Sequence, residues 1–220
     1  MRIACALLCV LLLASCNPFA QQPPRITRPP EPTFRPLVGS DALSLVSKSV
    51  TVTYAVAYAM QGDIDRTRVT GSWTTYQRPP NVRLDMMVNS EGGQAINFRS
   101  YVTPEGTIVC QIATPPVCQR AGEAAGPDAS ATNLLARRPA DYTVVEREKL
   151  KIADEQTECF LFRPNEGTDA SFKEAFICYA PDGVPLMIDM DLNDGSSFAL
   201  EGRIVKRTVT DAEMRPPDLR

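Results

Sequence analysis

The sequence contains no histidine, and this absence excludes several kinds of site at once. Histidine is the commonest general base and the commonest transition-metal ligand, so Ser-His-Asp triads, Cys-His proteases and histidine zinc sites are ruled out. A glycine-rich phosphate loop, a nucleophile elbow and a recognisable catalytic carboxylate pair are also missing. A near match to a calcium loop at 189–195 lacks the turn glycine and the bidentate glutamate, so we interpret it as a strand entering a turn. The sequence predicts a protein that is not an enzyme and that uses no metal or cofactor.

An excess of positive charge is missing as well. The chain has 23 Lys and Arg against 26 Asp and Glu, a net charge of −3, so the basic footprint of a nucleic-acid-binding protein is absent. At the same time, 220 residues with 44% hydrophobic content are enough for one sizeable core. We therefore expect one globular domain and no nucleic-acid partner.

The longest apolar run is too short to span a membrane. It covers residues 3–13 and would be roughly 16 Å long as a helix, against about 30 Å for the hydrocarbon core. Because Arg2 precedes it, residues 1–15 are predicted to be a secretory signal peptide. The residues Leu13-Ala14-Ser15-Cys16 resemble the lipobox of bacterial lipoproteins, in which the cysteine is lipidated and cleavage occurs before it. The alternative is an ordinary signal peptide with a chance cysteine.

The lipobox resemblance implies that Cys16 becomes the first residue of the mature chain. It also implies that the chain has a membrane as partner, to which the lipid on Cys16 attaches it. A diacylglyceryl group supplies two acyl chains, which anchor stably where one chain does not. Residues 16–36 then form a linker, since seven of the 19 prolines lie in this stretch and favour an extended conformation. The remaining domain, 37–220, is expected in the bacterial cell envelope, facing the periplasm or the exterior.

Beyond residue 37 the pattern is that of long antiparallel strands. Gly39-Ser40-Asp41 and the apolar residues after it predict a short capped helix, and a second helix is predicted at 128–137, before Pro139. The other segments alternate between apolar and polar residues and are separated by glycine and proline turns, which is typical of an antiparallel meander. Strands are predicted at 50–60, 66–77, 82–89, 95–103, 142–148, 157–163, 172–179, 185–191 and 197–210, with turns at 61–63, 78–81, 91–93 and 104–106.

Four cysteines remain once the signal peptide and the lipidation site are set aside, at positions 110, 118, 159 and 178. An even number in an exported domain indicates two disulfides, for which three connectivities are possible. Each of the pairs 110/118 and 159/178 is symmetric about a predicted turn, and hairpin partners lie close enough to be bridged, which favours Cys110–Cys118 and Cys159–Cys178. A metal site built from all four is the rival interpretation, but no C-x2-C pair is present.

Aromatic and methionine side chains concentrate in the first four predicted strands. They form either a filled core or an apolar concavity that accepts lipid chains, to whose irregular shape methionine adapts. The candidate ligand-binding residues are Tyr54, Val56, Tyr58, Met60, Trp73, Leu84 and Met86. Their neighbours on the opposite face, such as Thr53 and Arg83, are expected to be exposed.

Over residues 37–217 the order of elements resembles that of the lipoprotein-carrier superfamily of bacterial envelopes, which includes the periplasmic lipoprotein carrier and its outer-membrane receptor. The matching features are a helix before long antiparallel strands, a helical insert midway, the hairpin at 181–185, the closing strand at 197–210 and the tail at 209–217. The resemblance implies an α+β fold: a strongly curved antiparallel sheet, or half-barrel, with helices covering its concave face. It also implies a lipid-anchored envelope lipoprotein that binds or carries lipids, acyl chains or lipoproteins. The alternative is a non-enzymatic envelope interaction or regulatory module with a solid core.

We predict that membrane attachment depends on one sulfur atom. In Cys16→Ala the thiol that would receive the lipid is gone, so the chain should stay unprocessed and incorporate no labelled fatty acid. Metabolic labelling of cells that express the two chains measures this. Equal labelling of the variant and the natural chain would contradict the lipobox interpretation.

Overall fold

The computed structural model describes residues 33–93, 95–113, 116–121 and 131–216. Cys16, the signal peptide and most of the predicted linker lie outside these residues. The strands are β1 (Arg35–Pro36), β2 (Tyr54–Ile64), β3 (Thr67–Arg78), β4 (Asn81–Ser90), β5 (Ile96–Thr103), β6 (Gly106–Gln111), β7 (Val117–Ala121), β8 (Tyr142–Glu146), β9 (Leu150–Ile152), β10 (Glu155–Pro164), β11 (Phe172–Tyr179), β12 (Pro185–Leu192) and β13 (Ser197–Lys206). The helices are α1 (Asp41–Ser49), α2 (Ala131–Arg137), the 3-10 turn η1 (Pro139–Asp141) and α3 (Asp211–Met214).

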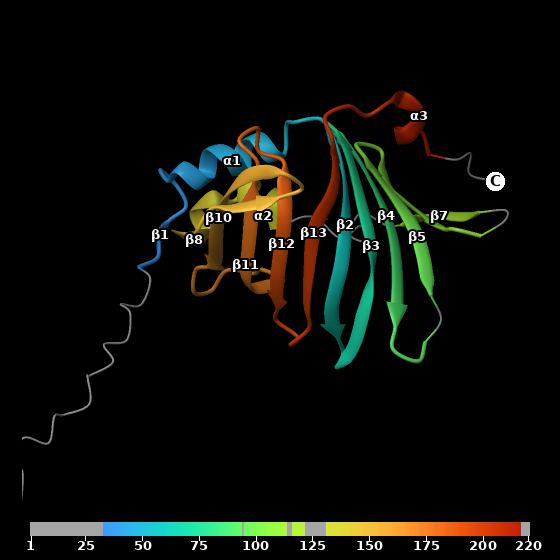
Figure 1. The fold of residues 1–220 in the computed structure, drawn as a ribbon, viewed down its shortest axis with the longest axis horizontal. Coiled ribbons are helices and arrows are strands. Elements are labelled where there is room, and N and C mark those ends of the chain that lie inside the picture. The colour runs from blue at the N-terminus through green and yellow to red at the C-terminus, as the bar shows by residue number, and fades with distance from the viewer. Residues whose placement is uncertain (1–32, 94, 114–115, 122–130, 217–220) are drawn as a thin grey trace, which may run out of the picture. The chain divides into compact units, whose positions relative to one another are not determined.

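All of these strands belong to one sheet, and each pairs antiparallel with its neighbours. The order is β1-β8-β10-β11-β12-β13-β2-β3-β4-β5-β6-β7, with β9 paired to β10 beside this path. β1 and β7 stand at opposite ends and are not paired with each other, so the sheet stays open, and Figure 1 shows its twisted course. The predicted α+β fold with a curved, half-barrel sheet is confirmed.

Two faces of this sheet follow from the alternation of side chains along each strand. The inner face is defined here as the one that carries Tyr58, Trp73, Met86 and Phe98, which are consecutive partners across β2 to β5. The outer face carries the residues between them, such as Asp85.

Helices α1 and α2 contribute to the main core together with the neighbouring strands β8, β10, β11, β12, β13 and β2. Ala42, Val46 and Leu135 are fully buried and belong to the same apolar cluster as Tyr58 and Phe160. The helices pack against each other beside the β8–β13 half of the sheet, where Figure 1 shows them. Burial of each large apolar side chain contributes about 1.5–3 kcal/mol, so this half holds most of the stabilising apolar surface. No helix of the described part of the chain is long and apolar enough to cross a membrane.

Residues from Thr33 onward form one unit that contains this core. The unit begins within the segment predicted as linker, because Arg35 and Pro36 form β1 and pair with β8. Helix α1 begins after Ser40 as predicted, although the Ser40 hydroxyl donates to the carbonyl oxygen of Leu37 rather than capping the helix.

The turn predicted at 61–63 is wrong. Strand β2 continues to Ile64, and the chain reverses at Asp65–Arg66, whose φ angles of 50° and 64° are left-handed. Gly62 is needed for a different reason: a Cβ atom at this position would lie 2.3 Å from the carbonyl oxygen of Ser197 on the neighbouring strand β13. This glycine allows a close approach of two strands, a role that looks like a turn signal in the sequence.

The last predicted strand is also shorter than expected. It ends at Lys206 instead of residue 210, and the chain then forms the one-turn helix α3. The Thr210 side chain accepts from the backbone N–H of Glu213, and the Glu213 side chain accepts from the Thr210 backbone, which is a capping box. No sequence pattern predicted this helix or the short strands β1 and β9.

Both disulfides join cysteines that are direct partners on neighbouring strands. Cys110 on β6 pairs with Cys118 on β7, and Cys159 on β10 pairs with Cys178 on β11. The Cα–Cα distance is 4.0 Å in each pair. This is the connectivity that the hairpin symmetry predicted.

We predict that Gly62→Ala lowers the free energy of unfolding by about 1–3 kcal/mol, because β13 must move away from the added methyl group. Gly93→Ala is the control, since its added Cβ meets chiefly the rotatable hydroxyl of Ser90 and should change stability by no more than about 0.5 kcal/mol. Urea unfolding of both variants measures the difference. Equal stability of the two variants would show that the strands at Gly62 are not closely apposed.

Candidate functional site

The inner face of the five strands β3 to β7 carries no charged side chain. Its positions hold only apolar residues, serine, threonine and glutamine, and all of these strands lie within the described residues. The charged residues of the same strands are all on the outer face: Arg68, Arg78, Arg83, Asp85, Arg99 and Arg120. The sheet thus presents one uncharged surface, which is the candidate site.

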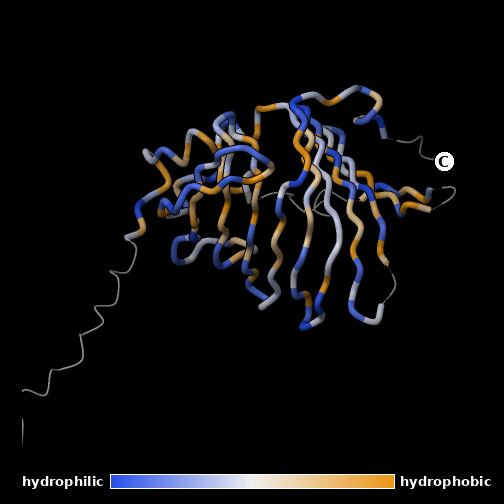
Figure 2. Tube along the Cα trace, in the orientation of Figure 1, coloured by the Kyte–Doolittle hydropathy of each residue, from blue (hydrophilic) through white to orange (hydrophobic). Residues whose placement is uncertain are grey.

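An apolar row crosses the middle of this surface. Trp73 lies between Tyr58 and Met86, and Met86 lies opposite Phe98 in turn. Side chains directly opposite each other on antiparallel strands are close enough to touch, so these residues form a continuous strip. The Trp73 indole N–H donates to the Thr75 hydroxyl oxygen at 3.0 Å, which satisfies the one polar atom of the ring. In Figure 2 the turn between β2 and β3 is hydrophilic, and hydrophobic segments lie within the strands.

The predicted ligand-binding residues divide into two groups. Tyr54, Val56, Tyr58 and Met60, all on β2, are at most 6% exposed and belong to the main core. Trp73 and Met86 are only half-buried and pack against the edge of that core. Leu84 shares the inner face with them and is 1% exposed. The sequence pattern correctly grouped these residues on one face, but it did not separate the filled part from the open part.

The tyrosines of the filled part are neutral. Burial raises the pKa of the Tyr54, Tyr58 and Tyr179 hydroxyls well above its ordinary value. The Tyr58 hydroxyl donates to the carbonyl oxygen of Pro185 at 2.7 Å, which ties β2 to the start of β12. This end of the inner face is packed protein and offers no charge to a ligand.

Arg83 is not exposed, contrary to the prediction, and Thr53 is half-buried rather than exposed. The Arg83 guanidinium lies 4.5 Å from the centre of the Tyr76 ring, and one of its N–H groups donates to the backbone oxygen of Glu213 at 2.6 Å. The segment that holds α3 therefore covers the outer face at β3 and β4, where Met214 packs in a small apolar cluster. Alternation assigns a residue to a face but does not reveal what covers that face. The capping box around Glu213 was the available signal.

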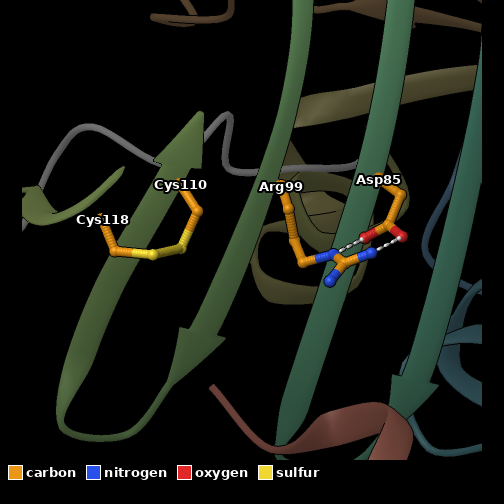
Figure 3. Close-up of a disulfide and its surroundings, with 4 residues drawn as sticks. All are labelled: Asp85, Arg99, Cys110 and Cys118. Carbon is orange, nitrogen blue, oxygen red and sulfur yellow. Dashed lines mark hydrogen bonds and ion pairs between the residues drawn. A yellow bond between two sulfur atoms is a disulfide. The ribbon is translucent and has the colours of Figure 1, made fainter. Parts of the chain in front are cut away.

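Asp85 links Arg83 to Arg99 on the outer face. Its two carboxylate oxygens accept hydrogen bonds from the Arg99 Nε and Nη2 atoms at 2.7 and 2.8 Å (Figure 3). They also accept hydrogen bonds from the Arg83 guanidinium. Burial raises the pKa of Asp85. The hydrogen bonds and charges of the two arginines lower this pKa by more than burial raises it, so the net shift is downward. The Cys110–Cys118 disulfide stands next to Arg99 on this face. This network of two arginines and one carboxylate lies on the side of the sheet opposite the candidate site.

No group of three or more Cys, Asp or Glu side chains that could hold a metal ion occurs in the part of the chain that the structure describes. Residues 189–195, whose sequence nearly matches a calcium loop, run from strand β12 into the turn at Asn193–Gly195. In this turn Gly195 has a φ of 90° and the Asp194 side chain accepts a hydrogen bond from the backbone N–H of Ser196.

Comparison with known proteins identifies no family model and no curated protein that matches. Among solved structures the chain is similar to MucB, with 11% identity over 81% of this chain and 64% of that one and a TM-score of 0.51. It is also similar to a chain of the Pseudomonas aeruginosa MucA/MucB complex (10% identity, 81% and 62% covered, TM-score 0.49). A third similar structure is the Mycobacterium tuberculosis lipoprotein LppX (14% identity, 78% and 99% covered, TM-score 0.46). The chain spans less than two thirds of the MucB chain. The likeness to MucB shows that the two chains share a fold.

We predict that Asp85→Asn lowers the free energy of unfolding at pH 7 by on the order of 2 kcal/mol, since hydrogen bonds to charged groups each contribute about 1.5–3 kcal/mol. The lowered pKa means that the native carboxylate stabilises the fold above the ordinary value near 3.9 and that this contribution is lost as the pH falls through the folded-state value. The difference between the two chains should therefore be full at pH 7 and shrink below about pH 4.

Asp154→Asn is the matched control for this experiment. Asp154 also pairs with a cation, Lys151, but its side chain is 97% exposed, so its loss should cost no more than about 0.5 kcal/mol. Chemical unfolding at several pH values measures both variants. A stability difference for Asp85→Asn that stays constant down to pH 2 would contradict the assigned charge network.

Proposed function

We propose that this chain is a lipid-anchored, non-enzymatic protein of the bacterial cell envelope that binds acyl chains of lipids or lipoproteins on the inner face of β3 to β6. The observation that carries the proposal is the uncharged inner face with its half-buried strip of Trp73, Met86 and Phe98. Burial of an acyl chain on this strip would contribute a favourable free energy of about 0.8 kcal/mol per methylene. A bilayer gives the same chain nearly the same burial, so the proposed activity is reversible exchange rather than tight capture.

The exposure along this surface supports a ligand without charge. On β5 the inner residues run from Ile96, which is 61% exposed, through the half-buried Phe98 to the buried Ser100. Two apolar side chains, Ile96 and Phe98, thus lead from the exposed end of β5 toward its buried part. Methionine suits such a surface because its flexible chain adapts to ligands of irregular shape.

The envelope location rests on the N-terminal sequence. The lipobox around Cys16 and the proline-rich stretch after it would attach the folded unit to a membrane through a spacer.

A second function is favoured by the burial of Tyr54, Val56, Tyr58 and Met60. These four residues were predicted to line the pocket, yet they are packed in the main core. If the rest of the inner face is equally closed in solution, the protein is an envelope interaction or regulatory module with a solid core, whose partner is another protein.

Met86 and Met87 distinguish the two functions, because they are adjacent on β4 and point to opposite faces. We predict that Met86→Arg stays folded and slows the exchange of fluorescent lipid between vesicles and protein at least tenfold, since the charge would lie where the chain binds. Met87→Arg is the control: this side chain is on the outer face and 44% exposed, so exchange should remain at the natural rate.

The chain from residue 17 onward, made without its lipid, serves for this assay because it contains the whole described unit. Circular dichroism of both variants reports folding. Unfolding of Met86→Arg alone would favour the solid-core module, and exchange at the natural rate by a folded Met86→Arg would remove the inner face as the lipid site.

A further inference from the structure

One corner of the sheet leaves large apolar side chains exposed. Three of the seven such side chains that are exposed in the described residues lie together, at the start of β5, just after β6 and at the start of β7. They are Ile96 (61% exposed), Ile112 (46%) and Val117 (65%), and we call them the apolar corner. Neighbouring exposed apolar side chains on a folded domain mark an interaction surface.

Backbone pairing brings the three residues together. The backbone N–H of Ile112 donates to the carbonyl oxygen of Asn97, the residue after Ile96, at 3.1 Å. Val117 is the partner of Gln111, the residue before Ile112. Since neighbouring strands lie about 4.8 Å apart, the three side chains belong to one surface that spans β5, β6 and β7. Helices α1 and α2 pack beside the other half of the sheet (Figure 1).

The corner is apolar on both faces of the sheet. Ile96 lies two residues before Phe98 and so shares the inner face with it. Val117 also belongs to this face, since its partner Gln111 is paired with Phe98. Ile112 follows Gln111 and therefore lies on the outer face.

This exposure on both faces favours a membrane over other occupants. A lipid chain bound on the inner face would leave Ile112 in water, and a protein docked on the outer face would leave Ile96 and Val117 in water. A bilayer can bury all three at once, because its fluid interior surrounds whatever projects into it.

The surroundings of the corner are uncharged, which also suits a bilayer. Asp85 and Arg99 occupy the next row of the outer face, where they bind each other. Met87 is exposed as well, but it lies three strands from the end strand β7 and outside the corner. The cross-strand rows that contain or border the corner hold no acidic or basic side chain; they are Gly71-Val88-Ile96, Ser72-Met87-Asn97 and Trp73-Met86-Phe98-Gln111-Val117.

The predicted anchor would hold the corner within reach of a membrane. Residues 16–32 precede the folded unit, and these 17 residues of proline-rich chain can span about 50 Å when extended. Strand β7 is the eleventh after β1 in the order of the sheet, which corresponds to about 50 Å at about 4.8 Å per strand. A linker of this length therefore lets the corner touch the bilayer that holds the lipid.

We propose that the apolar corner docks the folded unit on the surface of a lipid bilayer, with Ile96, Ile112 and Val117 inserted at the boundary between headgroups and acyl chains. The insertion is shallow, because hydrocarbon cannot satisfy the backbone groups at the edge of a sheet. Docking does not depend on the acyl-chain site, since no lipid has to leave the bilayer. It would bring the strip of the inner face to the membrane, because Phe98 and Val117 belong to the same cross-strand row.

Binding to neutral vesicles tests this inference. The chain from residue 17 onward, made without its lipid, is mixed with vesicles of phosphatidylcholine, and the bound fraction is measured by flotation. We expect the natural chain to bind and Ile112→Asp to lower the partition coefficient at least tenfold, because a carboxylate would have to leave water. Ile112 is on the outer face, so this loss cannot come from the acyl-chain site. Val117→Asp makes the same test from β7 and should give the same loss.

Ile204→Asp is the matched control. Ile204 is also an isoleucine of the outer face and is 61% exposed, but it lies on β13, opposite Ala57. This variant should bind vesicles within about twofold of the natural chain, and circular dichroism should show every variant folded, since the replaced side chains are exposed. Met86→Arg should also keep the natural vesicle binding, so that docking and lipid exchange are measured separately.

Three results would overturn the inference. The first is no binding to neutral vesicles, or equal binding by Ile112→Asp and Ile204→Asp. The second is binding that requires anionic lipid and disappears at high salt, which would show attraction to basic residues instead. The third is a dimer that does not bind vesicles and that Ile112→Asp dissociates in sedimentation experiments, which would assign the corner to a second copy of the chain.

Discussion

The separation of charge between the two faces of the long strands is the constraint on which the rest of this structure depends. In β3 to β7 every charged side chain is on the outer face, so that face can hold ion pairs and a covering segment, and the inner face can meet only apolar or neutral groups. Asp85 and its two arginines illustrate the first role. The strip around Met86 illustrates the second. One alternation of side chains therefore sets both the stability of this half and the chemistry of its proposed ligand.

The two halves of the sheet differ in how completely their inner face is covered. From β8 to β2 the inner face is covered and packed, and the helices share its core. From β3 to β6 the same face is covered only in part. Val69, Leu84 and Ser100 are buried, but Trp73, Met86 and Phe98 are only half-buried, so the apolar surface of this half is not fully used for folding. The filled half supplies stability that the open half does not need to provide.

Much of this architecture could be predicted from the sequence, because long alternating strands and turn residues have clear local signals. The strand pattern, the helix after Ser40 and the pairing of Cys159 with Cys178 follow from spacing alone. What failed was information about neighbours distant in the chain. Gly62 reads as a turn until Ser197 is placed beside it, and Arg83 reads as exposed until the α3 segment covers it. The division of the inner face into a filled and an open part likewise depends on where α1 and α2 pack.

The pairing of β13 with β2 has a consequence for the time at which this protein can fold. It joins residues 55–63 with residues 197–206. Strand β13 is the last strand in the chain, and its pairing with β2 connects the two halves of the sheet. Hairpins such as β2–β3 can form as soon as they are synthesised, but the core cannot close until the ribosome has made nearly the whole chain. A chain whose core has not closed in this way is not yet stably folded during synthesis. That is the state in which a polypeptide can be threaded across a membrane before it folds on the far side.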